Sequence, residues 1–126
     1  MNDSFDDETL KLLDETKEVK IETRRDDESP EHRTTIWVVV VEDEVFVRSV
    51  RGPNGRWYRE ISSNPEGALH VGDTRIPVRA TPAAEDTTVD TVSDAIRSKY
   101  GKNSSSSTAS MVRSDTLPTT LKLVPA

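Results

Sequence analysis

The sequence predicts a mainly β domain, a barrel of about six strands flanked by two or three helices. Short runs of β-branched residues with alternating polarity recur along the chain, and turn residues join them into two hairpins. Only a few segments show the apolar spacing of an amphipathic helix instead. Two hairpins plus a first and a last strand favour a sheet that closes on itself, because closure removes unpaired strand edges.

The whole chain, residues 1–126, is expected to form one domain, since its length suits a single hydrophobic core. Hydrophobic residues make up 33% of the chain and are concentrated in its middle. Residues 1–17 are acidic and helical in pattern, so we expect an N-terminal extension there. Residues 102–118 contain a run of serines and predict a flexible loop.

Three helices are expected, over Ser4–Thr16, from Asn54 or Gly55 to Ser63, and over Thr87–Tyr100. Ser4 can cap the first helix. The second helix ends before Pro65, because proline disfavours a helical residue in front of it. The third is the best defined, with one apolar stripe made of Val89, Val92, Ile96 and Tyr100.

Six strands are expected, over Val19–Thr23, Thr34–Val41, Val45–Arg51, Ala68–Val71, Thr74–Thr81 and Thr119–Val124. The second strand is apolar on both faces from Ile36 onward, so both of its faces should be covered. Pro77 lies within the fifth strand and donates no amide hydrogen bond. We therefore expect that strand to be an edge strand or to be interrupted at Pro77.

Composition excludes several classes of function. The chain has no cysteine, which excludes disulfides, thiolate metal sites and cysteine nucleophiles. It shows neither a signal-peptide pattern nor an apolar run of membrane length, so we expect a cytoplasmic protein without a membrane partner. The net charge is −6, and 12 of the 23 acidic residues fall within residues 1–31. Because no basic stripe offsets them, nucleic acid is not an expected partner either.

The segment from Arg48 to Arg59 is the strongest candidate for a binding site. It combines arginines, glycines and aromatic residues at a strand end, a loop and a helix start. Arginine forks match phosphate oxygens, glycines let the backbone approach, and a helix N-terminus offers free amides to an anion. Trp57 and Tyr58 could lie against a flat ring. The alternative is that these arginines only solvate the surface or pair with acids such as Glu60.

A second candidate segment, His32–Trp37, offers Arg33 and threonine hydroxyls to a phosphate, although threonine is also simply a good strand former. His32 and His70 are the chain's two histidines, and the helical spacing His-x-x-x-His is absent. A histidine metal site would need carboxylate help, so we expect structural roles for both and no metal. Motifs of serine hydrolases, phosphate loops and dinucleotide-binding domains are absent as well.

Several landmarks together resemble a family of uncharacterised bacterial proteins related to the flavin- and deazaflavin-binding split barrels. They are Arg33–Trp37, Val45–Gly52, Gly55–Arg59, Asn64–Pro65, Gly72 with Arg75–Val78, Ala95 with Lys99–Gly101, and Thr119–Leu123. The likeness covers nearly the whole chain after about Glu18, and the segment from Arg48 to Arg59 is its most specific part.

The resemblance implies a split β-barrel of the pyridoxamine-phosphate oxidase kind, often a homodimer, with the cofactor lying along the barrel near the dimer interface. It also implies that a phosphate is held by Arg33, Thr35, Arg48 and Ser49, and that Trp57 and Tyr58 flank the ring or the interface. Together with the arginine segment, this gives as candidate cofactor-binding residues Arg33, Thr35, Trp37, Arg48, Ser49, Arg51, Gly52, Arg56, Trp57 and Tyr58.

The cofactor stays open between FMN and a deazaflavin coenzyme. Deazaflavin-binding relatives usually have a basic Gly-Arg-x-Ser-Gly-type loop before the Arg-Thr strand. Here the segment Arg25–Glu31 carries four acids, which would repel a highly anionic tail. We therefore expect a flavin-type binding protein, with oxidoreductase activity as the leading hypothesis. The alternatives are a non-catalytic module for a small anion or cofactor, and an interaction protein that binds no cofactor.

Overall fold

A computed structural model of the chain describes residues 5–101, 109, 111–113 and 116–126. In chain order, its helices and strands are α1 (Asp7–Glu15), β1 (Glu18–Thr23), β2 (His32–Trp37), β3 (Val39–Val41), β4 (Glu44–Val47), the 3₁₀ helix η1 (Gly52–Asn54), α2 (Arg56–Ser63), β5 (Glu66–Val71), β6 (Thr74–Pro82), α3 (Asp86–Tyr100), the 3₁₀ helix η2 (Leu117–Thr119) and β7 (Leu121–Pro125). No helix within the described ranges is long and apolar enough to cross a bilayer.

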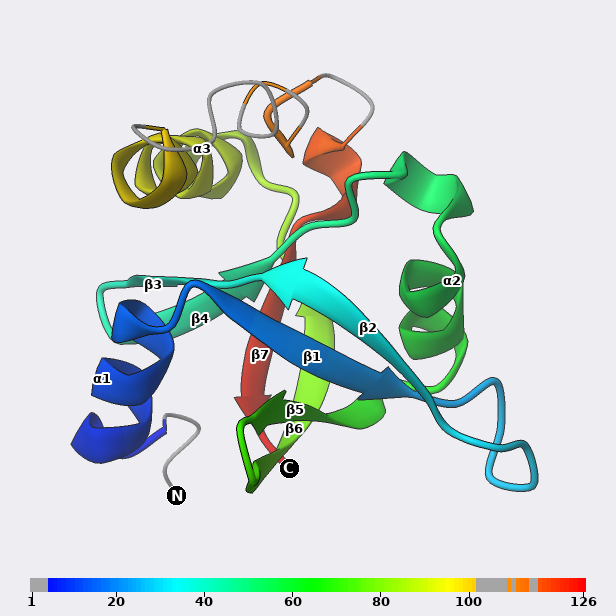
Figure 1. Cartoon of the computed structure of the whole chain (residues 1–126). Helices are drawn as coiled ribbons and strands as arrows, with labels where there is room; N and C mark the ends of the chain where they lie inside the picture. The colour runs from blue at the N-terminus through cyan, green and yellow to red at the C-terminus, as the bar shows by residue number, and fades with distance from the viewer. Residues whose placement is uncertain (1–4, 102–108, 110, 114–115) are drawn as a thin grey trace.

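The strands form one antiparallel sheet in the order β2-β1-β5-β6-β7-β4-β3 (Figure 1). Its two edge strands, β2 and β3, are consecutive in the chain and are separated by Val38 alone. The sheet therefore curls until its edges come together at this residue. The barrel is split on the other side of Val38, between β2 and the segment that follows β4. The mainly β prediction is confirmed. The seventh strand arises because the expected strand over Thr34–Val41 is two strands.

The break at Val38 is stabilised by the end of α3. The Val38 amide donates a hydrogen bond to the Tyr100 hydroxyl at 3.2 Å, and its carbonyl accepts one from Lys99 Nζ at 2.7 Å. The same two side chains reach the N-terminal segment, because Tyr100 donates to the Lys17 carbonyl at 2.6 Å and Lys99 to the Leu13 carbonyl at 2.9 Å. Burial lowers the pKa of Lys99 to about 8 and raises that of Tyr100 to about 12.

Two groups of buried side chains form the core. The larger packs the inner face of the strands against residues of α1 and α2, among them Leu13, Ile21, Ile61, Leu69 and Leu123. The smaller lies between α3 and the outer face of β3 and β4 (Figure 1), and it contains Val39, Phe46, Val92, Ile96, Tyr100 and Met111. The expected apolar stripe of α3 is thus buried.

Three local predictions need correction. The predicted strand over Val45–Arg51 ends at Val47, because the Ser49 amide bonds to Thr119 Oγ1 instead of to a neighbouring strand. The cap of α1 is Asp6, which accepts from the Thr9 amide. Ser4 lies outside the described residues, as does most of the predicted loop 102–118.

Pro77 does not lie in an edge strand, because β6 pairs with β5 on one side and β7 on the other. The β7 ladder begins at the pair Val78–Pro125, and the Pro77 carbonyl accepts from the Ala126 amide just beyond it. The amide nitrogen and the carbonyl of a strand residue point towards the same neighbouring strand. The nitrogen of Pro77 therefore points towards β7, at the position just past the last residue of that strand. Its missing N–H therefore removes no bond from the ladder.

We predict that Tyr100→Phe lowers the free energy of unfolding by about 1–3 kcal/mol, because it leaves the Val38 amide and the Lys17 carbonyl with one partner fewer in a buried place. Tyr58→Phe is the control, since no hydrogen bond of the Tyr58 hydroxyl is found in the described part of the chain. Urea unfolding followed by circular dichroism measures both. Equal stability of the two variants would contradict the role given to Tyr100.

Candidate functional site

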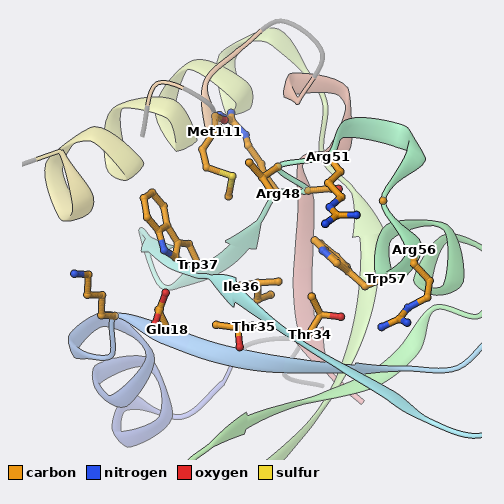
Figure 2. Close-up of a pocket in the computed structure, with 14 residues that line it drawn as sticks. Glu18, Thr34, Thr35, Ile36, Trp37, Arg48, Arg51, Arg56, Trp57 and Met111 are labelled. Carbon is orange, nitrogen blue, oxygen red and sulfur yellow. The ribbon is translucent and has the colours of Figure 1, made fainter. Parts of the chain in front are cut away.

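A pocket of about 630 Å³ opens at the split of the barrel, between β2 on one side and the segment that follows β4 on the other (Figure 2). Extending the β3–β4 pairing, in which Val39 faces Phe46, would place Trp37 opposite Arg48 and Thr34 opposite Arg51. These residues line the two walls instead of pairing. The full lining is Lys17, Glu18, Thr34, Thr35, Ile36, Trp37, Arg48, Ser49, Val50, Arg51, Gly55, Arg56, Trp57 and Met111.

The structure brings seven of the ten candidate cofactor-binding residues together in this lining, namely Thr35, Trp37, Arg48, Ser49, Arg51, Arg56 and Trp57. The other three lie outside it. Arg33 is exposed and pairs with Glu31 at 2.7 Å, while Gly52 is buried in a turn with φ of 68°. Tyr58 packs against the core, edge-on to Trp57.

Arg48 is part of the pocket wall but is bound to the protein interior. Its side chain is 1% exposed and donates to Thr120 Oγ1 at 2.8 Å, Ser93 Oγ at 2.8 Å, and the carbonyls of Val89 at 2.7 Å and Met111 at 3.2 Å. Burial, together with the charge of Arg97, lowers the pKa of Arg48 to about 10. The guanidinium therefore joins the end of β4 to α3 and to the C-terminal segment.

Arg51 and Arg56 are exposed, and neither has a hydrogen bond or an ion pair with any residue that the structure describes. Figure 2 shows them on either side of the Trp57 indole. The acid that could have paired with them is engaged elsewhere, because Glu60 accepts from Thr23 Oγ1 at 2.8 Å and contacts His32 Nδ1 at 3.0 Å. Two cationic groups are thus available at one end of the pocket.

Next to these arginines lies a polar atom that the protein leaves unsatisfied. Ser49 is 1% exposed, and its Oγ has no hydrogen-bond partner among the described residues. It lies against Gly55, where an added Cβ would come within 2.4 Å of it. Gly55 is the N-cap of α2 and, lacking a side chain, makes no side-chain capping bond. The first-turn amides of α2 therefore begin at the pocket without a capping oxygen.

Aromatic rings contribute two surfaces to the lining. The Trp37 indole stacks on Tyr100 with ring centroids 3.9 Å apart and planes within 4°. Trp57 is largely buried and lies on the opposite wall (Figure 2). Glu18 is the carboxylate of the lining and lies below Trp37, away from the arginines (Figure 2). A planar ligand with an anionic end fits such a combination of rings and charges.

Sequence reasoning missed seven lining residues, namely Lys17, Glu18, Thr34, Ile36, Val50, Gly55 and Met111. Thr34, Ile36 and Val50 could have been found by extending the hairpin pairing past Val38. Glu18 comes to the pocket through its pairing with Trp37. Met111 arrives from the segment after α3, for which the sequence carries no signal.

Both histidines pair with glutamates outside the pocket. His70 Nε2 lies 2.8 Å from a Glu22 oxygen, and Arg75 donates to both oxygens of that carboxylate. The hydrogen bonds from Arg75, followed by those from His70, lower the pKa of Glu22 to about 2. Ligand atoms of Glu22, Glu31 and His70 lie within 4.8 Å of one another, so the carboxylates that a histidine metal site needs are at hand. Arg75 already neutralises Glu22 there.

Comparisons with known proteins identify a family for this chain. The model of a family described as "Uncharacterized protein conserved in bacteria (DUF2255)" matches residues 9–123. Among curated proteins, none matches the chain.

Solved structures show the fold. The heme storage protein HutZ from Vibrio cholerae is 15% identical, with a TM-score of 0.64 over 94% of this chain and 88% of its own. A putative pyridoxamine 5′-phosphate oxidase from Listeria innocua is 12% identical, with a TM-score of 0.63 over 95% and 90%. An F420-H2 dependent reductase is 14% identical, with a TM-score of 0.59 over 85% and 92%. The chain therefore has the split-barrel fold.

We predict that Arg48→Met destabilises the protein by about 3 kcal/mol or more, because it leaves several buried hydroxyls and carbonyls without their donor. Arg51→Met is the matched control and should change stability by no more than about 0.5 kcal/mol, since Arg51 is exposed and unpaired in the described structure. Chemical denaturation compares them. Similar losses in both variants would show that Arg48 is not a structural residue.

We predict a specific acid sensitivity from Glu22. Because its folded-state pKa is near 2, against an ordinary value of 4.5, its stabilising contribution is complete above pH 4.5 and is lost as the pH falls towards 2. Glu22→Gln should therefore be less stable than the parent protein at pH 7, and this difference should shrink over that window. Glu66→Gln, at an exposed position, should follow the parent protein. A pH-independent difference would refute the assignment.

Proposed function

We propose, from the premise that this chain belongs to the DUF2255 family of bacterial proteins, that its pocket binds a flavin-type cofactor and that the protein is an oxidoreductase. One observation carries the proposal: two indole rings and two arginines without a partner among the described residues meet in a pocket of about 630 Å³ at the split of the barrel. Pockets of 300–1,000 Å³ with apolar walls and a few placed polar groups are typical small-molecule sites.

The lining divides into parts that would hold different parts of the cofactor. Trp37 and Trp57 would contact the planar ring, and Ile36 and Met111 add apolar surface between them. Arg51 and Arg56 would bind the anionic end. The cofactor, when bound, would supply hydride transfer, so the protein's contribution is to bind and orient the ring and to exclude water from it.

The charge around the pocket favours FMN over a deazaflavin coenzyme. Thr34, at the end of the lining, lies only three residues from Glu31, in the loop that joins β1 and β2. The three arginines of this region already pair with acids, Arg24 and Arg33 with Glu31 and Arg25 with Asp26. A long anionic tail that continued along β2 would therefore meet uncompensated acids such as Asp27 and Glu28.

A homodimer is also proposed, on a different basis from the sequence analysis. The edge strand expected at Pro77 is an internal strand and offers no edge to a partner. The outer edge of β2, next to the pocket, is the strand edge that a second copy could cover. Sedimentation velocity of the purified protein would show a monomer if this proposal is wrong.

We predict that FMN binds with a dissociation constant in the micromolar range or tighter, and that Val50→Trp weakens it at least tenfold. Val50 is 46% exposed and lines the pocket, so a larger ring there fills the space for the ligand. Leu12→Trp is the control, because Leu12 has a similar exposure of 37% on α1, outside the lining.

Quenching of flavin fluorescence measures both variants, and a mass spectrum of the untreated protein identifies any ligand that co-purifies. Flavin that binds without being reduced by nicotinamide nucleotides or other donors would leave the non-catalytic binding module as the function. No binding of FMN or a deazaflavin by the parent protein would reject the proposal.

A further inference from the structure

We propose that the pocket contains a binding site for one phosphate group at the start of α2, and hence that its ligand is a phosphate monoester. The site consists of the first-turn amides of α2, the hydroxyl of Ser49, and the guanidinium groups of Arg51 and Arg56. This inference rests on the proposed function for the place of the ligand, and it specifies which chemical group the arginine end of the pocket binds.

The first turn of α2 lacks the negative charge that the other helix starts have. In α1, Asp6 caps the helix, and Asp7 and Glu8 follow it. α2 begins at Arg56 with no acidic residue in its first turn and no side-chain cap. A cation at this position is unfavourable, because the helix N-terminus itself carries a partial positive charge. An anion bound there would bond to the free amides and offset both charges.

Ser49 gives an independent indication of a ligand at the same place. A buried hydroxyl without a partner is costly, and native proteins rarely retain one without a reason. Within the described ranges the Ser49 oxygen is such an atom, and it lies in the pocket lining against Gly55, the N-cap of α2. Gly55 leaves the room that a Cβ would fill. A small rotation of the serine side chain would let its hydroxyl donate to an anion at the helix start.

The number of free charges favours a single phosphate. Arg51 and Arg56 are the two lining arginines without a partner in the described structure, while Arg48 is engaged inside the protein. A phosphate monoester carries nearly two negative charges at neutral pH, which these two groups balance. Glu18 is on the far side of the pocket, below Trp37 (Figure 2), so among the residues that the structure describes no lining carboxylate opposes an anion at the arginine end.

The test compares FMN with riboflavin, which has the same ring but no phosphate, and adds inorganic phosphate as a third probe. The parent protein should bind FMN at least tenfold more tightly than riboflavin. Inorganic phosphate at millimolar concentration should raise the melting temperature and compete with FMN but not with riboflavin. Arg56→Gln should reduce the FMN preference about tenfold. Arg59→Gln, on the same helix but outside the lining, should leave it unchanged.

Ser49→Ala gives a readout that a purely structural serine would not. Removing an unsatisfied hydroxyl should leave the melting temperature of the ligand-free protein unchanged or higher, while the preference for FMN over riboflavin falls by roughly tenfold. A serine that only supports the fold would lower the melting temperature and weaken both ligands equally, and that result would overturn its role.

The outcomes separate this inference from the proposed function. Equal affinity for FMN and riboflavin, with no effect of phosphate, would overturn the phosphate site and leave flavin binding intact. Stabilisation by phosphate that disappears in Arg56→Gln, without binding of either flavin, would support the phosphate site and reject the flavin. No response to any of the three probes would overturn both.

Discussion

The hydrogen bonds between Tyr100 and the backbone at Val38 are the constraint on which the rest of this structure depends. A seven-stranded sheet that curls must bring its two edges together, and here both edges belong to one continuous stretch of chain. At Val38 that stretch leaves one side of the sheet and joins the other, so its backbone groups have no strand partner there. The end of α3 supplies the missing partners at the point where the walls diverge.

The pocket follows from this break in the pairing. The pairing of β3 with β4 could have continued into β2 and the residues after Val47. These two segments separate instead, and their side chains become the two walls of the pocket. Arg48 keeps the second wall in place from behind, through its bonds to α3 and to the C-terminal segment. Arg51 and Arg56, only a few residues later, have no partner in the part of the chain that the structure describes. One short arginine-rich segment thus contains both the support of the wall and two of the charges that line the pocket.

Much of the fold could be predicted from local patterns. The apolar stripe of α3 and the two hairpins depend on periodicity and turn residues that are visible in a short window of sequence. The division of the strand at Val38 could not be predicted, because six consecutive apolar and aromatic residues give no local reason to break. The reason is Tyr100, more than sixty positions away. The edge-strand prediction at Pro77 was wrong for a similar reason. The place where β7 ends determines which β6 residue needs no amide hydrogen bond, and this place is not visible in the sequence around Pro77.

The candidate site was predicted only in part, because some of its features depend on contacts between distant parts of the chain. The arginine segment is conspicuous in the sequence, and seven of its ten associated candidates do meet in one pocket. What the sequence could not show is which arginines are free. Arg48 and Arg51 look alike in a list of residues, but one is 1% exposed with four bonds and the other is exposed without a partner in the described structure. That distinction depends on Ser93 and Thr120, which come from distant elements.

The contacts of Tyr100 also bear on how the molecule assembles. Its hydroxyl joins residues 62 and 83 positions earlier in the chain, so the loops that these bonds close are among the longest in the domain. Closing a long loop costs more conformational entropy than pairing neighbouring strands does. Non-local contacts of this kind therefore slow folding. During synthesis on the ribosome, the strands up to β6 can emerge and pair before α3 is complete. We therefore expect the pocket to form late in folding, once the last turn of α3 has docked against Val38.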